Sequence, residues 1–153
     1  MLTVSIVLIV VALAYFVTTT LVDLGPLNNV NAATARERRT EVAINVPILI
    51  LPAVLLALGG TLGKSWLVYA GAGVQGLIFL SGLALWWLPY LVGYTAPWAT
   101  AGTGTTWKEL HARTYAHTII VLPRIGDRPR PNLEHMILHS LYLAAALAGL
   151  AAA

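Results

Sequence analysis

The sequence predicts an all-α, polytopic integral membrane protein in which four transmembrane helices form one bundle domain over residues 1–153. Hydrophobic residues make up 58% of the chain and charged residues only 10%, whereas a typical soluble domain is about 25% charged. Apolar stretches of about 20 residues, the length that crosses a bilayer, recur along the chain. Because every backbone N–H and C=O group in hydrocarbon must be paired within its own segment, we expect these stretches to be helices.

Four stretches qualify as spans by length and apolar composition. They cover about residues 2–22, 42–62, 66–90 and 133–153. The first lacks a basic start and is longer than the apolar part of a secretory signal peptide, so we expect a membrane anchor that ends at Asp23. In the second, Pro47 and Pro52 each remove a backbone hydrogen bond and predict a bend. Its expected role is packing, with a gate as the alternative.

Basic residues gather in two of the loops, about 23–41 and 91–132, which hold eight of the nine Lys and Arg residues. Lys64 stands alone in the short turn between the second and third spans. Since loops rich in Lys and Arg stay in the cytoplasm, we expect both loops to be cytoplasmic and both termini extracytoplasmic, in the plasma membrane. The net charge of +3 therefore reflects topology, and no nucleic-acid partner is expected, because that would need a soluble basic face.

Two capping boxes mark helix starts in these loops. Thr34-Ala35-Arg36-Glu37 predicts that the second helix begins near Ala35, before its apolar part. Thr106-Trp107-Lys108-Glu109 predicts a short amphipathic helix that runs to about His117. We expect this helix to lie flat in the cytoplasmic headgroup layer, between the third and fourth spans. Asn132 is the predicted N-cap of the fourth span.

Aromatic residues near the ends of the spans predict contacts with the membrane interface, where Trp and Tyr are enriched. Trp107, His111 and Tyr115 are four residues apart and share one face of the short helix. The predicted interface set is Trp86, Trp87, Tyr90, Trp107 and Tyr115.

Small residues within the third and fourth spans predict close helix packing, because they let backbones approach where lipid offers no hydrophobic drive. Gln75, in the middle of the third span, needs a hydrogen-bond partner on another helix. The predicted packing set is Ala72, Gln75, Gly76, Ala145 and Gly149. These residues pack inside one bundle or against another protein. The expected partners are therefore the lipid bilayer and, as an open alternative, a homo-oligomer or a larger membrane complex.

Candidate metal ligands lie in the second basic loop and at the start of the fourth span. Neutral imidazoles and carboxylates bind zinc, iron or copper, and the candidates are His111, His117, Glu134, His135 and His139. Structural hydrogen bonding and proton handling are the alternative roles of these histidines. The chain has no cysteine and no recognisable nucleophile, so we predict no catalytic residue. The sequence requires no cofactor and identifies none, and it leaves a divalent metal as an open candidate.

Two classes of function stay open. The first is a small non-enzymatic membrane protein that acts as a scaffold, accessory subunit or oligomer-forming element through helix packing. The second is a metal- or proton-handling membrane enzyme or transporter that uses a histidine cluster at the cytoplasmic face. No charged residue is expected at the bilayer centre, and ion-coupled transporters generally mark their path with such residues. The first class is therefore favoured.

Overall fold

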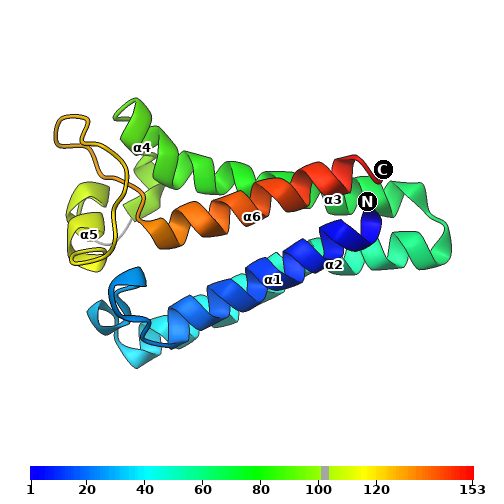
Figure 1. Ribbon diagram of the computed structural model, residues 1–153, viewed down its shortest axis with the longest axis horizontal. Coiled ribbons are helices and arrows are strands. Elements are labelled where there is room, and N and C mark those ends of the chain that lie inside the picture. The colour runs from blue at the N-terminus through cyan, green and yellow to red at the C-terminus, as the bar shows by residue number, and fades with distance from the viewer. Residues whose placement is uncertain (101–103) are drawn as a thin grey trace.

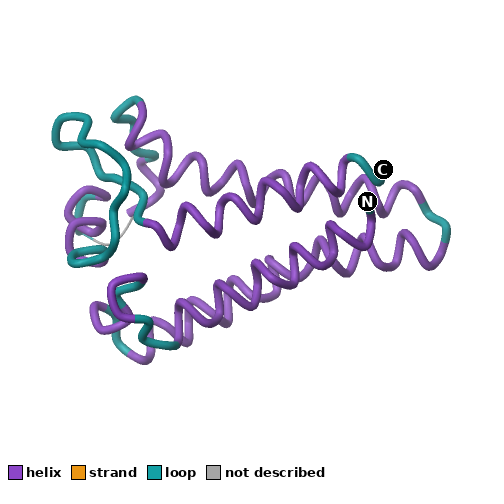
Figure 2. The backbone as a smooth tube through the Cα atoms, viewed as in Figure 1, coloured by secondary structure: helices purple, strands orange, loops and turns teal. Residues whose placement is uncertain are grey.

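The computed structural model describes residues 1–100 and 104–153, and within these ranges every regular element is a helix (Figures 1 and 2). The four long helices are α1 (Leu2–Leu21), α2 (Ala35–Leu62), α3 (Ser65–Gly82) and α6 (Leu133–Leu150). α3 continues through the π-helical turn η3 (Leu83–Trp87) into α4 (Leu88–Leu91). With α3, η3 and α4 taken as one continuous helix, four helices are long and apolar enough to cross a membrane. The prediction of an all-helical fold with four candidate spans is therefore confirmed.

The long helices pack as a ring. α1 packs against α2 and α6, and α3 packs against the same two helices. Both termini lie at one end of the bundle, with the short α2–α3 turn (Figure 1). The other end carries the two longer connections, including the short helix α5 (Trp107–Thr114). We call this the α5 end. Toward it, the α1–α2 pair diverges from the α3–α6 pair in Figure 1.

The helix starts follow the local capping signals. The Thr34 hydroxyl accepts from the Glu37 N–H, and the Glu37 carboxylate accepts from the Thr34 N–H at 2.7 Å, so α2 begins at Ala35 as predicted. Thr106 and Glu109 form the same box at the start of α5. Such reciprocal bonds satisfy N–H groups that the first turn of a helix leaves without partners. Asn132 caps α6 through its side chain, which accepts from the His135 N–H.

The turn η3 was not predicted. The Leu88 N–H bonds to the Leu83 carbonyl, five residues back, instead of the four-residue spacing of an α-helix. Pro89 follows directly, and its ring would clash with the carbonyl four residues earlier in a regular helix. Widening the helix by one residue avoids this clash, which is a recognised cause of π-turns and kinks. The turn carries Trp86 and Trp87 into the α5 end.

Small residues make a close internal seam among α1, α3 and α6. A Cβ at Gly149 would lie 3.1 Å from the Ser5 hydroxyl oxygen and 3.3 Å from the Ala72 Cβ. The Ser5 hydroxyl donates to the Ala145 carbonyl at 2.8 Å. Ser5, Ala72 and Ala145 are all fully enclosed. Because no larger side chain fits between these backbones, the seam depends on its small residues.

Two further members of the predicted packing set behave differently from each other. The Gln75 side chain is buried and donates to the Tyr142 carbonyl of α6 at 3.3 Å, which meets its need for a partner inside the bundle. Gly76, in contrast, is not at a close approach within one protomer. A Cβ built on it meets no described atom within 4 Å, and the same holds for Gly73. These two glycines lie on an outward side of α3.

Candidate functional site

Aromatic rings gather around Trp86 at the α5 end, where η3, α5 and the start of α6 meet. The Trp86 ring stacks on the His135 ring, with centroids 3.6 Å apart and planes 27° from parallel. Trp107, His111 and Tyr115 meet Trp86 edge-on, with centroids at 5.5, 5.3 and 4.8 Å respectively. We call these five residues the Trp86 cluster. The face of α5 that carries Trp107, His111 and Tyr115 is thus turned toward the protein. Offset and edge-on ring pairs of this kind add stability beyond that of burial alone.

The predicted interface aromatics need a correction. Trp86 is only 8% exposed and Tyr90 only 4%, so both lie inside the protein rather than on a lipid-facing rim. The Tyr90 hydroxyl donates to the Pro123 carbonyl at 3.1 Å. Of the residues that follow, Tyr94 and Trp98 are the exposed aromatics. The sequence indicates amphipathic rings near a helix end, but whether they face lipid or a folded loop depends on where that loop lies.

The hydrogen bonds of two histidines fix which nitrogen carries the proton. The Nδ1 of His135 lies 2.7 Å from the Asn132 side-chain oxygen. That oxygen only accepts, so Nδ1 of His135 is the donor and Nε2 carries the lone pair. His139 is the reverse case, because its Nδ1 accepts from the Trp87 indole N–H at 3.0 Å. The His139 ring also fills the space above Gly82, where a Cβ would lie 2.8 Å from the ring.

His111 is buried in the Trp86 cluster as a neutral imidazole. The main chain of Arg130 accepts a hydrogen bond from its ring. Its Nε2 has no hydrogen-bond partner within the described residues. Burial lowers the pKa of His111 from its ordinary 6.5 to about 4, because a charged ring is poorly solvated there. Burial raises the pKa of the neighbouring Tyr115 hydroxyl for the same reason.

The five predicted metal ligands do not converge. His117 stands apart in a left-handed turn with φ of 66°, after α5 has ended at Thr114 rather than near His117. Glu134 lines a cavity with His135, whereas His139 bonds to Trp87. Over residues 1–100 and 104–153, no group of three or more His, Asp or Glu side chains is arranged to hold a metal ion.

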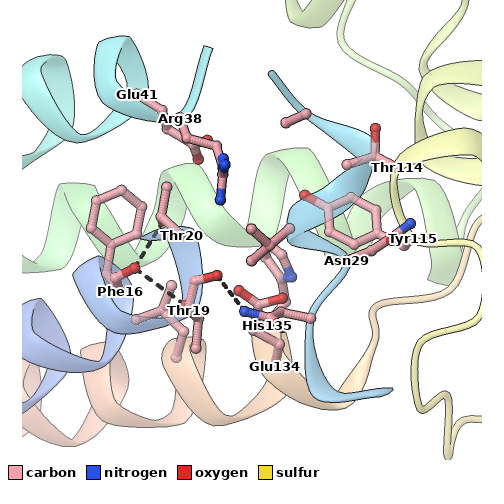
Figure 3. A pocket seen from close by; sticks show the side chains of 14 residues that line it. Phe16, Thr19, Thr20, Asn29, Arg38, Glu41, Thr114, Tyr115, Glu134 and His135 are labelled. Atoms are coloured by element: carbon pink, nitrogen blue, oxygen red, sulfur yellow. Dashed lines mark hydrogen bonds between the residues drawn. The ribbon is translucent and has the colours of Figure 1, made fainter. Parts of the chain in front are cut away.

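A polar cavity of about 100 Å³ lies beside the Trp86 cluster, and we call it the end cavity (Figure 3). Its walls come from α1, the connection between α1 and α2, α2 itself, the C-terminal end of α5 and the start of α6. The charged and aromatic residues of the wall are Phe16, Arg38, Glu41, Tyr115, Glu134 and His135. Figure 3 shows the Arg38 and Glu134 side chains directed toward the same space.

Among the described residues, Arg38, Glu41 and Glu134 of the end cavity form no ion pair. Glu134 is only 8% exposed, and the side chains of Thr19 and Asn132 lie beside its carboxyl group. The Arg38 Nε is buried and has no hydrogen-bond partner among the described residues. In the part of the chain that the structure describes, the ion pair is the one between Lys108 and Asp127, outside this cavity. Glu134 is buried, Arg38 is half-buried and Glu41 is exposed, so the cost of a charge held away from water applies to Glu134.

Sequence reasoning missed Arg38 and Glu41. Both were visible as charges three residues apart, hence on one face of the first turns of a helix predicted to begin at Ala35. The sequence does not indicate that this face of α2 lies across the cavity from α6. Comparison of the chain with protein-family models, curated proteins and solved structures gives no match. The functional argument therefore depends on the residues described above.

Proposed function

We propose that this chain is a multi-pass membrane protein of non-enzymatic type that acts through helix packing, as an oligomer-forming scaffold or accessory subunit. In this proposal the four long helices cross the plasma membrane, with the α5 end in the cytoplasm and both termini outside. The bias of Lys and Arg toward the two loops at the α5 end supports this orientation. Large apolar side chains exposed on the long helices, such as Val10 and Leu147, support lipid contact.

The observation that carries the proposal is a face of α3 on which small residues have no neighbour in the protein. Ala70, Gly73 and Gly76 recur every three residues on one side of the helix. A Cβ at either glycine would meet no described atom within 4 Å. Tyr69 and Leu77 lie four residues before and after Gly73, so they stand at the two ends of the same face, and they are 59% and 66% exposed. We call these five residues the α3 groove.

Glycines elsewhere in the long helices are used inside the protomer. A Cβ at Gly71 would lie 3.0 Å from the Pro52 carbonyl oxygen, and one at Gly59 would lie 2.9 Å from the Val68 nitrogen. A glycine in a helix interior costs about 1 kcal/mol relative to alanine, and close approach of another backbone is what offsets that cost in a membrane. In this proposal, the backbone that approaches Gly73 and Gly76 belongs to another molecule.

We assign the partner at the α3 groove to a second copy of this chain. In a two-fold dimer the same surface meets itself, and α3 from each copy would cross near Gly73. The exposed Tyr69 and Leu77 side chains of one copy would then flank the glycines of the other. A face with small residues between two large apolar ones is self-complementary in this way. The small residues at the crossing let two parallel helices touch.

Disulfide crosslinking tests the dimer directly, because the natural chain has no cysteine. With Gly73→Cys as the single thiol, mild oxidation of native membranes should convert the protein to a covalent dimer. Leu147→Cys on α6, at a position 58% exposed, is the matched control and should stay monomeric. Equal crosslinking of both variants, or none at Gly73→Cys, would contradict the assignment of the α3 groove.

Metal or proton handling is the second candidate function. The free Nε2 atom of buried His111 and the lone pair of His135 on Nε2, inferred from its contact with Asn132, favour it. A ring nitrogen whose other nitrogen is held by a hydrogen bond is the usual form of a ligand or a base. Elemental analysis of the purified protein tests this role. Stoichiometric zinc, iron or copper that is lost in His111→Ala and His135→Ala would support it, and metal-free wild-type protein would remove the metal part.

A further inference from the structure

We propose that the end cavity binds a small zwitterion that carries a primary ammonium group and an oxyanion. This is the chemistry of a free amino acid or of an ethanolamine phosphate headgroup. The inference goes beyond the packing role of the α3 groove and does not depend on it, because the two surfaces share no residue.

One wall of the end cavity is rich in hydrogen-bond acceptors. The Glu134 carboxyl group is buried there, and Glu41 of α2 lines the same space. His135 also lines it, with its Nδ1 bonded to Asn132, so its remaining nitrogen offers a lone pair. A primary ammonium has three N–H donors and no acceptor. It is therefore the ligand group that such a wall recognises.

Aromatic rings strengthen this preference for a cation. Phe16 from α1 and Tyr115 after α5 both line the end cavity. The face of an aromatic ring attracts a nearby ammonium through its quadrupole, and more strongly when water is excluded. Tyr115 is itself held in place by its edge-on contact with Trp86. The Trp86 cluster thus positions one wall of the cavity.

Arg38 favours an anion in the same ligand. Its terminal nitrogen donates to the Leu21 carbonyl at 3.4 Å, and its buried Nε has no acceptor among the described residues. A guanidinium presents a planar fork of donors that suits a carboxylate or a phosphate. The Glu134 and Glu41 carboxyl groups are partners for an ammonium, and the Arg38 guanidinium is a partner for an oxyanion. A ligand with both groups engages each of these side chains, whereas a bare cation or a bare anion leaves one kind without a partner.

The size of the cavity sets an upper limit on the ligand. A volume of about 100 Å³ is well below the roughly 300–1,000 Å³ of sites for drug-sized molecules. The end cavity fits a headgroup or a short amino acid, and it does not fit a nucleotide or a haem. Because its lining residues lie at the α5 end, where the proposed orientation places the membrane surface, water and the lipid headgroup layer are the two sources of a ligand.

Binding tests with matched probes decide the proposal and separate the two sources. The protein in phosphatidylcholine nanodiscs is titrated with glycine and, separately, with glycerophosphoethanolamine, and thermal stability and calorimetric heat are measured. A parallel sample replaces part of the phosphatidylcholine with phosphatidylethanolamine. Choline is the control headgroup, since its quaternary ammonium has no N–H donor. Saturable binding of a soluble probe identifies a free ligand, and stabilisation by phosphatidylethanolamine alone identifies a lipid.

Three variants connect the binding to the cavity. Arg38→Gln and Glu134→Gln should each weaken binding at least tenfold, whereas Arg39→Gln, an exposed neighbour, should bind as the wild type does. If Glu134→Gln does not fold, Arg38→Gln tests the anion side alone, because it lies in the first turns of α2. The proposal is overturned if no ethanolamine or amino-acid probe binds. It is equally overturned if choline probes bind as well as ethanolamine probes, or if Arg39→Gln weakens binding as much as Arg38→Gln.

Discussion

Gly71 and Gly73 lie two residues apart on α3, and substitution by alanine should separate the inside of the bundle from its outside. At Gly71 the new Cβ would lie 2.9 Å from the Leu56 Cγ, 3.0 Å from the Pro52 carbonyl oxygen and 3.1 Å from the Leu56 nitrogen. Two of these three atoms belong to the α2 backbone, which cannot move aside as a flexible side chain can. At Gly73 no described atom lies within 4 Å.

The free energies follow from these distances. Overpacking a well-filled contact costs about 1–3 kcal/mol, and replacing a helix-interior glycine with alanine returns up to about 1 kcal/mol through propensity. Gly71→Ala should therefore range from nearly neutral to about 3 kcal/mol less stable, while Gly73→Ala should be neutral or up to about 1 kcal/mol more stable. The difference between the variants, about 1–3 kcal/mol, equals the overpacking cost alone.

The assay is reversible unfolding in mixed micelles, at a detergent ratio where the protein is monomeric. Gly73→Leu, measured beside the alanine variants, should keep wild-type stability as a monomer. In native membranes it should also lose the covalent dimer that Gly76→Cys, as the single thiol, otherwise forms on oxidation. Equal stability of Gly71→Ala and Gly73→Ala would refute the packing of α3 against α2. Destabilisation of monomeric Gly73→Leu would refute the open α3 groove.

Two further outcomes test the α5 end. Lowering the pH from 6.5 to about 4 should destabilise the protein, because burial holds the pKa of His111 at about 4 in the folded state and the unfolded chain takes up the proton first. Denaturant titrations across this range should show a smaller loss in His111→Phe, with the exposed His117→Gln as control, and an unchanged loss would contradict it. Thr106→Ala removes the cap of α5 and should cost about 0.5–2 kcal/mol, seen as faster hydrogen exchange over residues 107–114. Exchange at free-peptide rates in the wild type as well would show that α5 is not folded onto the bundle.

The local elements of the fold were predictable because their signals lie within a few residues. A Thr followed three residues later by Glu fixes the starts of α2 and α5, and the Asn132 cap fixes the start of α6, whatever the rest of the chain does. Apolar length identifies the four candidate spans in the same way. The turn η3 had a signal in Pro89, but the sequence alone does not say whether a proline ends, kinks or widens a helix.

The candidate site was less predictable because it is made by long-range packing. His111 and His135 were identified as candidates from their residue type, yet their gathering around Trp86 depends on how the loop after α4 returns to the bundle. Glu41 and Arg38 looked like solvated charges at a helix start, and only the position of α6 makes them part of a cavity. Gly76 was predicted to pack closely because it is small, yet it has no close neighbour in the bundle. A small residue in a span does not reveal which surface it faces.

The account depends most on four helices crossing the bilayer with the α5 end in the cytoplasm. Labelling of single cysteines with a membrane-impermeant maleimide on intact cells tests this directly. Ala152→Cys at the terminal end should react without permeabilisation, and Gly126→Cys in the second basic loop should react only after it. Reaction of both on intact cells, or of Gly126→Cys alone, would contradict the orientation and the cytoplasmic placement of the end cavity.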